Sequence, residues 1–356
     1  MKDLTYIEYL FLDCISTGRP IWDATLFYTL IGKRTVSTMP QCSQYDLEAY
    51  FTVMPGMKPT ALKKGLERLV SDGLISGNEG EGFLLSEAGS AKKAEFFSRH
   101  AHFSLGSQLE FALVQSVLRR RMLFLIQVLS EMLHKNKHYY PVEREAKEQL
   151  WMKRLLTQQA GDKAVFARAY GEEWRSYLSR LPERDAGLFV LQFEGADHLR
   201  KTTGQMAGLL SFEEAEVKIL LHQNWLRLYG TLEKEPENFP VLASVMQMTI
   251  KENGLASASA ETTMGYFMHG HGMAEIISMR GLKQSTIQDH FAEIALIYPE
   301  FPTQRFLDKE KMQYLQQLVE HKVRVDYREI QKVFPEITFF ESRLIQIRSE
   351  VAVKYG

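Results

Sequence analysis

The sequence predicts a mainly α-helical protein in three parts: a winged-helix-like N-terminal domain over 1–103, a central helical domain over 104–255 and a C-terminal helix-turn-helix domain over 256–356. Three observations predict this architecture: a helix–hairpin–helix order near the N-terminus, a long middle part with helical periodicity, and a tight helix–turn–helix pattern near the C-terminus. A chain of 356 residues is also long for one core, because domains cluster near about 100 to 200 residues.

The N-terminal domain is predicted from the stretch that follows Pro59. Apolar residues at i, i+4, i+7 and i+8 line one face of a helix over Pro59–Asp72. On that face lie Leu62, Leu66, Leu69 and Val70. Short apolar strands at 74–76 and 83–85 then flank the glycine-rich tip 77–82, which is typical of a β-hairpin, and another helix is expected from Glu87. This order resembles a winged helix-turn-helix domain.

The charge of the hairpin tip bears on what such a domain contacts. A wing that meets phosphate should be basic, whereas this tip carries Glu79 and Glu81. Protein contact is therefore favoured over DNA contact for the N-terminal domain. The alternative is a small helical domain whose hairpin only covers its own core.

The middle of the chain is predicted to be a helical bundle or array. The expected helices are Leu105–Leu133, Val142–Leu156, Lys163–Leu181, Phe212–Tyr229 and Val241–Glu252. Aromatic residues among the aliphatic ones are interpreted as core packing rather than as a base-stacking platform. They include Phe166, Trp174, Tyr177, Phe189, Phe193 and Trp225. The run Arg119–Arg121 is interpreted as a solvated helix face, because at most two of its guanidinium groups can face one phosphate strand.

The stretch from Ala260 to Pro299 follows a small-residue segment, Ala256–Ala260, that we expect to be a linker. It is predicted to form three short helices, of which the second covers Met273–Arg280 and the third Gln284–Ile297. Gly281 supplies the turn between them, because the turn needs a residue that tolerates positive φ. Leu282 is expected to fill the gap between the helices, and the third helix is expected to dock through Ile287, Phe291 and Ile294.

The opposite face of the third helix carries the candidate nucleic-acid contacts. The residues predicted to bind are Arg280, Lys283, Gln284, Ser285, Thr286 and Gln288. Amides, hydroxyls and a lysine at the start of a recognition helix reach base edges and phosphates. Three acidic residues, Glu275, Asp289 and Glu293, are expected to dilute the positive charge. The competing interpretation is a helix-turn-helix that only docks another protein.

Composition argues against most catalytic chemistry. The formal charge of −1 means that any contact with nucleic acid must be local, and two cysteines are too few for a disulfide framework or a cysteine-rich metal site. His269 and His271 point about 200° apart on a helix end, so a metal site is not expected there, and His290 is interpreted as a hydrogen-bonding histidine. We predict no enzyme activity, no cofactor and no metal.

Nucleotide hydrolysis and membrane insertion are also not expected. Gly32-Lys33-Arg34-Thr35 has Phe27 where a phosphate-binding loop needs its first glycine. Acidic residues interrupt the apolar N-terminal stretch, unlike in a signal peptide, and the apolar run 122–129 is too short for a span of about 20 residues. A cytoplasmic location is expected.

The stretch from Gly272 to Phe291 resembles the helicase-type helix-turn-helix at the C-termini of some bacterial RecQ-family DNA helicases. The stretch Glu336–Ile345 resembles the closing helix of the same family, and Thr338 with Glu341 predicts a capping box there. The whole chain resembles the YpbB family of bacterial proteins, whose gene lies beside that of a RecQ-type helicase. The resemblance is strongest over Ala260–Lys354, weaker near the N-terminus, and rests in the middle only on length and helicity.

This resemblance implies a non-catalytic accessory protein of a RecQ-family DNA helicase, acting in DNA repair or recombination. The helicase would supply the motor, and this chain a DNA-contacting helix-turn-helix. The N-terminal domain or the central helices would hold the motor. The alternative is a transcription regulator that reads an operator as a dimer. An enzyme with an unfamiliar site in the helical middle is a third possibility.

Overall fold

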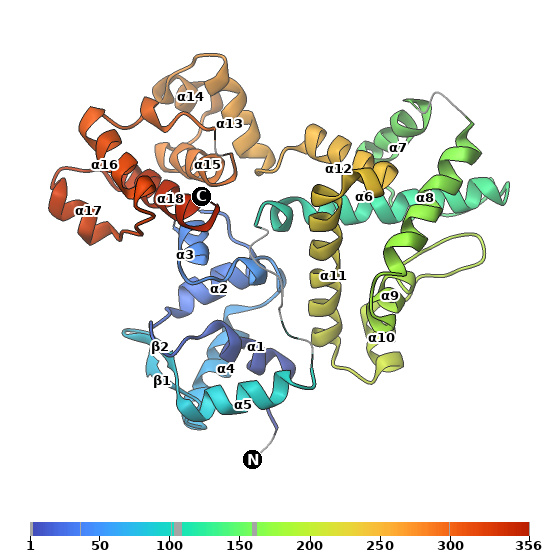
Figure 1. The fold of residues 1–356 in the computed structure, drawn as a ribbon, viewed down its shortest axis with the longest axis horizontal. Helices are drawn as coiled ribbons and strands as arrows, with labels where there is room; N and C mark the ends of the chain where they lie inside the picture. The colour runs from blue at the N-terminus through green and yellow to red at the C-terminus, as the bar shows by residue number, and fades with distance from the viewer. Residues whose placement is uncertain are drawn as a thin grey trace. The chain divides into compact units, whose positions relative to one another are not determined.

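The computed structural model describes residues 3–35, 37–100, 102, 109–158, 162–298 and 300–355. Over these residues the chain is mainly α-helical, with one two-stranded antiparallel hairpin (Figure 1), as the sequence predicts. Its contacts group into two compact units. We call the first, within 1–9 and 94–253, the central unit, and the second, within 10–93 and 254–356, the terminal unit. The division into three domains stays a prediction, and its first boundary, at 103/104, lies outside the described residues.

The N-terminal elements follow the order of a winged helix. They are α1 (Tyr6–Cys14), α2 (Asp23–Ile31), α3 (Thr38–Gln44), a 3-10 turn (Glu48–Tyr50), α4 (Pro59–Ser71), β1 (Ile75–Asn78), β2 (Gly82–Leu85) and α5 (Glu87–Phe97). The predicted order of helix, hairpin and helix is confirmed. An addition that the sequence did not reveal is α3, which lies between α2 and α4 and packs on α15 and α18 of the C-terminal region.

The hairpin owes its shape to two glycines and to a third short segment. Gly77 and Gly82 have φ of +111° and +82°, a backbone region that L side chains rarely adopt. Ile75 pairs with Leu85 at the base of the hairpin. On the outer edge of β2, Ile21 and Phe83 exchange backbone hydrogen bonds with N···O distances of 3.0 and 2.8 Å. This antiparallel bridge ties the segment between α1 and α2 to the hairpin.

The C-terminal region contains only helices within its described residues. They are α13 (Ala258–Met268), α14 (Met273–Arg280), α15 (Gln284–Ile297), a 3-10 turn (Thr303–Arg305), α16 (Lys309–Glu320), α17 (Tyr327–Val333) and α18 (Phe339–Tyr355). The linker expected over Ala256–Ala260 is wrong, because Ser257 caps α13 by accepting a hydrogen bond from the Ala260 N–H. Ala260 is fully buried in the core between the helices.

The central unit is built around two long helices. Its helices are α6 (Leu109–Leu133), α7 (Ala146–Gln158), α8 (Lys163–Leu178), α9 (Glu183–Val190), α10 (Thr203–Leu210), α11 (Glu214–Lys234) and α12 (Pro240–Asn253), with a 3-10 turn at Pro236–Asn238. α8, α11 and α12 all pack on α6. The helices α9 and α10 are not predicted from the sequence. Each has eight residues, and so short a helix shows little periodicity. The expected start of α6 at Leu105 lies outside the described residues.

Aromatic side chains form the core of the central unit, as predicted. Trp225 is completely buried, and its ring centroid lies 5.1 Å from that of Phe189 and 6.0 Å from that of Trp174. The Trp225 indole N–H donates a hydrogen bond to the Gln192 side chain at 3.0 Å. These rings are therefore packed against each other and are not presented to solvent for base stacking.

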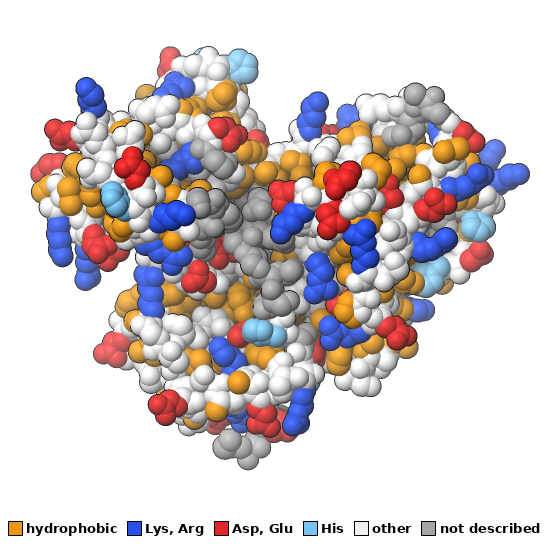
Figure 2. Space-filling view, viewed as in Figure 1, with side chains coloured by type: hydrophobic (Ala, Val, Ile, Leu, Met, Phe, Trp, Pro, Cys, Tyr) orange, Lys and Arg blue, Asp and Glu red, His pale blue; other side chains and the backbone are white. Residues whose placement is uncertain are grey.

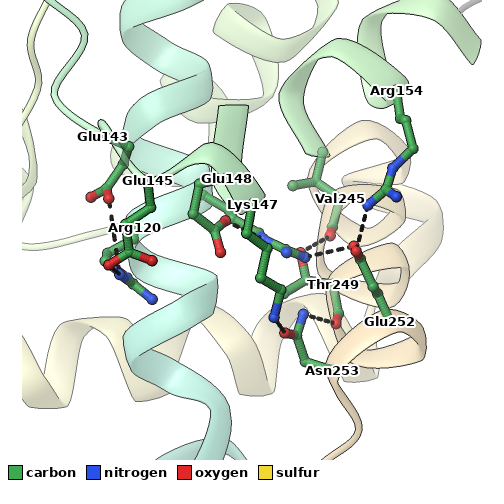
Figure 3. A network of polar contacts seen from close by, with 11 residues as sticks. Arg120, Glu143, Glu145, Lys147, Glu148, Arg154, Val245, Thr249, Glu252 and Asn253 are labelled. Atoms are coloured by element: carbon green, nitrogen blue, oxygen red, sulfur yellow. Dashed lines mark hydrogen bonds and ion pairs between the residues drawn. The ribbon is translucent and has the colours of Figure 1, made fainter. Parts of the chain in front are cut away.

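The arginine run on α6 does not form the solvated face that its charge suggested. Arg121 is 1% exposed, and its guanidinium donates to Glu148 of α7 at 2.8 Å and to Glu252 of α12 at 3.1 Å. Glu252 also contacts Arg154, as the close view shows (Figure 3). Successive residues are turned by about 100°, so one arginine of three points to the neighbouring helices, where carboxylates compensate its desolvation. No helix in the described part of the chain is long and apolar enough to cross a membrane.

Candidate nucleic-acid interface

The turn between α14 and α15 has the geometry that the sequence predicts. Both helices have the predicted bounds, and Gly281 between them has a φ of +59°, in the left-handed region. A Cβ on Gly281 would meet no atom within 4 Å, so the turn selects glycine for its backbone conformation and not for lack of space. The helix-turn-helix therefore rests on a turn that other residues adopt only at a cost in free energy.

The inner face of α15 holds the three helices together. Ile287, Phe291 and Ile294 are completely buried, as predicted. The Phe291 ring centroid lies 5.1 Å from that of Phe267 on α13. Leu282 is partly buried against the same core, so it fills the gap after the turn as expected. This packing determines which face of α15 remains at the surface.

The start of α15 presents polar groups to solvent. Lys283, Gln284 and Ser285 are exposed, whereas Thr286 and Gln288 are half-buried. No side chain caps this helix, in contrast to α13, α16 and α17, which Ser257, Asp308 and Asp326 cap. Thr286 makes the first backbone hydrogen bond of the helix, to the Lys283 carbonyl at 3.0 Å. An uncapped, exposed helix N-terminus beside a lysine is a favourable environment for a phosphate group.

Arg280 differs from the other predicted contact residues because its guanidinium already has partners. It donates to the Ser259 hydroxyl at 3.1 Å and also to the Ser259 carbonyl and the Thr263 hydroxyl. Arg280 therefore ties α14 to α13. Its positive charge lies near the start of α15, but its hydrogen-bonding groups hold the fold.

His290 lies on the inner side of α15 and is buried, with 8% of its surface exposed. Its Nδ1 lies 2.8 Å from the Thr263 hydroxyl, which confirms the expected hydrogen-bonding role. Burial, followed by the nearby charge of Arg280, lowers the pKa of His290 below its ordinary value of 6.5. Since Thr263 accepts from Arg280, its hydroxyl is free to donate to a neutral His290. A chain of three side chains thus links α14, α13 and α15.

The acidic residues near α15 do not dilute its positive charge equally. Glu293, which was expected to do so, is 4% exposed and points inward, where it accepts hydrogen bonds from the backbone and side chain of Ser257. Arg34, between α2 and α3, lies 3.6 Å from it. Burial raises the pKa of Glu293. Glu275 is exposed but bonds back to the Gly272 N–H at 2.8 Å.

The histidines before α14 do not gather a metal-binding set. The His269 imidazole bonds to the Gly265 carbonyl at 2.7 Å, and His271 lies 3.7 Å from Glu275. Among the described residues there is no cluster of three histidine, cysteine or acidic side chains that could hold a metal ion. Over the face shown in Figure 2, basic and acidic side chains are interspersed, so any attraction of phosphate to α15 is local.

The fold and this site define a class: a mainly helical protein that carries a C-terminal helix-turn-helix. A family model described as a helix-turn-helix domain matches residues 259–346, which include α14 and α15. Along most of its length the chain is similar to Protein YpbB of Bacillus subtilis (strain 168), with 23% identity over 315 residues that cover 86% of this chain and 87% of that protein. The predicted resemblance to the YpbB family, with its helix-turn-helix domain, is confirmed. No solved structure matches the chain.

A second surface, on α4, is not apparent from the sequence. The face of α4 assigned to the core includes Val70, yet Val70 is 38% exposed and lines an open groove with Phe27 of α2. The heptad-like spacing placed Val70 correctly on the apolar face, but it could not show that this face is wider than the core beneath it.

Proposed function

We propose that this protein is a non-catalytic accessory subunit of a RecQ-family DNA helicase, to which it brings a DNA-contacting helix-turn-helix. The observation that carries the proposal is the exposed, uncapped start of α15, where Lys283, Gln284 and Ser285 stand free of the core that docks the helix. The YpbB similarity and the helix-turn-helix match support an accessory role in DNA transactions. Repair or recombination in the cytoplasm is the setting that this role implies.

The chemistry of the α15 surface suits DNA. The Lys283 ammonium and the free backbone N–H groups of the first turn would hold a phosphate and set the position of the helix. Gln284, Ser285 and Gln288 would then face the groove, where amides and hydroxyls bond to base edges. Arg280 would contribute charge more than contact, because three of its N–H donors already bond to α13. With so few cations, affinity is modest and falls as salt rises.

The surroundings of Lys33 support the proposal that the helicase, and not this chain, hydrolyses ATP. In sequence, Lys33 resembles the lysine of a phosphate-binding loop. Gly32 ends α2 in a left-handed conformation, and the Lys33 ammonium lies 3.7 Å from the centre of the Tyr28 ring. A phosphate-binding loop instead follows a strand and opens a helix. ATP hydrolysis would therefore come from the helicase, and this chain would increase the hold of the complex on DNA.

Fluorescence anisotropy with labelled forked and duplex DNA tests the proposal at several salt concentrations. The protein is measured alone and with the RecQ-type helicase. We expect weak, salt-dependent binding by the protein alone and tighter binding by a co-purifying complex. Absence of any salt-dependent DNA binding, alone or together, would overturn the DNA-contacting role. Failure to co-purify with the helicase, together with tight binding of a dimer to palindromic duplex, would favour a transcription regulator instead.

A further inference from the structure

An apolar groove lies between α2, α4 and the hairpin, within residues 10–93 of the terminal unit, which we call the winged region. It has a volume of about 550 Å³, within the usual range of ligand and peptide sites. Its walls are apolar side chains of α2, α4 and β2: Ala24, Phe27, Tyr28, Leu66, Val70 and Phe83. Phe27 and Tyr28 are only half-buried, and Val70 is 38% exposed. The groove therefore exposes aromatic and aliphatic side chains of a kind that soluble monomers usually bury.

The rim of this groove is acidic. Asp23, Glu67 and Glu79 all line it, and the one lysine among the lining residues, Lys63, lies 2.9 Å from the Glu79 carboxylate. That ion pair raises the pKa of Lys63 and cancels its charge toward a ligand. The remaining carboxylates leave a net negative rim around an apolar floor. A ligand with matching chemistry carries apolar side chains flanked by lysines or arginines.

Nucleic acid does not match this surface. In a winged helix that binds DNA, the helix equivalent to α4 and the wing approach phosphates, which requires free cations. Of the cations on α4, Lys63 is paired with Glu79 and Arg68 lies 3.7 Å from Asp72, whereas the exposed Lys64 does not line the groove. Glu81 at the hairpin tip adds a further negative charge. The elements that would face DNA instead frame an apolar cleft.

We infer that the groove between α2, α4 and the hairpin is the docking site for a basic amphipathic helix of a partner protein. An amphipathic helix inserts apolar side chains at i, i+3, i+4 and i+7 into such a groove. Its lysines and arginines then lie against Asp23 and Glu67 on the rim, the two lining carboxylates that Lys63 does not pair with. The inference goes beyond the proposed function, because it holds whether or not α15 binds DNA and whether or not the partner is a helicase.

The test uses the full-length protein and two labelled peptides of about four helical turns. Both peptides carry leucine and phenylalanine on one face; the first has lysine and arginine elsewhere, and the second has glutamate at the same positions. Fluorescence anisotropy should show the basic peptide binding roughly tenfold or more tightly than the acidic one, with the difference shrinking as salt rises. Equal binding of the two peptides, or binding of neither, would overturn the inference.

Matched variants locate the binding. Val70→Glu, at an exposed position of the apolar wall, should abolish binding of the basic peptide, and Glu67→Lys should weaken it roughly fivefold to tenfold. Glu87→Lys reverses a charge at the exposed start of α5, outside the groove, and should leave binding unchanged. Circular dichroism and thermal unfolding establish that each variant is folded.

Two results would assign the groove differently. If Glu87→Lys weakened the peptide as much as Glu67→Lys, the attraction would come from overall charge and the groove would have no role. If the protein were a dimer in sedimentation experiments and Val70→Glu made it a monomer, the occupant would be a second copy of the chain. Either result would overturn the docking of a partner helix. The groove variants should bind DNA as the unaltered protein does, because they leave α15 unchanged. Failure of the docking inference is therefore distinguishable from failure of the α15 proposal.

Discussion

Two regions of the terminal unit, the helices α14 and α15 and the winged region, share a helix–turn–helix arrangement. They differ in whether the exposed lysine is paired with a carboxylate. At the start of α15, Lys283 is exposed at an uncapped helix end, and Glu293, further along the helix, is turned inward. On α4, the exposed Lys63 is paired with Glu79 of the hairpin. The comparison teaches that backbone architecture does not decide the partner. The disposition of a few charges around the same elements separates a surface suited to phosphate from one suited to a basic protein segment.

The largest expected effect comes from removing the core that supports the α15 surface. Phe291→Ala should lower the free energy of unfolding by about 3–5 kcal/mol, because a completely buried ring leaves a cavity among its aromatic neighbours. Urea unfolding followed by circular dichroism measures it. Phe339→Ala is the matched control, since this ring is 47% exposed, and it should cost far less. Equal losses in the two variants would contradict the assigned core of the helix-turn-helix.

The second prediction tests the charge contrast directly. Lys283→Ala should weaken DNA binding roughly fivefold to tenfold at low salt and lower the salt slope by about 1, as expected for one lost phosphate contact. Lys63→Ala removes the same charge from the winged region and should change neither quantity, because Glu79 already neutralises it. Anisotropy titrations over a salt series measure both. If Lys63→Ala weakened DNA binding more than Lys283→Ala, the winged region and not α15 would be the DNA-contacting surface.

The third prediction concerns the turns, where the two regions should behave alike. Gly281 and Gly73 both have positive φ, +59° and +70°, and neither would meet an atom within 4 Å after gaining a Cβ. Alanine at either position should therefore cost about 1–2 kcal/mol of stability through backbone strain alone. Gly187→Ala, within α9 and also in open space, should instead stabilise the protein slightly. Chemical denaturation of the three variants distinguishes backbone strain at positive φ from the usual stabilisation of a helix when alanine replaces glycine.

The sequence was sufficient where local signals determine structure. The bounds of α14 and α15 follow from apolar spacing and from Gly281, and the Thr338–Glu341 capping box is present as predicted. It was insufficient where partners are distant in the chain. Arg121 is buried against carboxylates 27 and 131 residues away, and Glu293 of α15 meets Arg34 near α3. Apolar periodicity does not reveal such pairs. From the sequence alone, charged residues such as Arg121 and Glu293 are therefore expected at the surface.

The candidate site shows the same limit. Apolar spacing predicts that Lys283, Gln284 and Ser285 lie on the free face of α15, and their side-chain chemistry suggests contact with DNA. The charge of Arg280 suggests a phosphate contact, and only the structure shows that its guanidinium bonds to Ser259 and Thr263. The apolar groove could not be found from spacing, since Val70 obeys the same pattern as its buried neighbours. Exposure is a property of the assembled fold and not of one helix.

The smallest expected effect is a pH dependence confined to the helix-turn-helix region. The pKa of His290 is lowered in the folded protein, so the unfolded chain binds this proton more readily than the folded one. The contribution of His290 to stability is therefore fully present above its ordinary pKa of 6.5 and is lost as the pH falls below it. Protonation would also place a second positive charge beside Arg280 and prevent Nδ1 from accepting the Thr263 hydroxyl.

The winged region provides the internal control, because residues 10–93 contain no histidine. Amide hydrogen exchange at about pH 7.5 and about pH 5.5, corrected for the intrinsic exchange rate, should show protection lost in α13 and α15 on acidification, and retained in α4. His290→Asn keeps a hydrogen-bond acceptor near the position of Nδ1 but does not titrate, and it should remove the difference between the two regions. Equal losses in both regions of the wild type would mean that other groups govern the response, and that the Arg280–Thr263–His290 chain does not set the stability of the surface at α15.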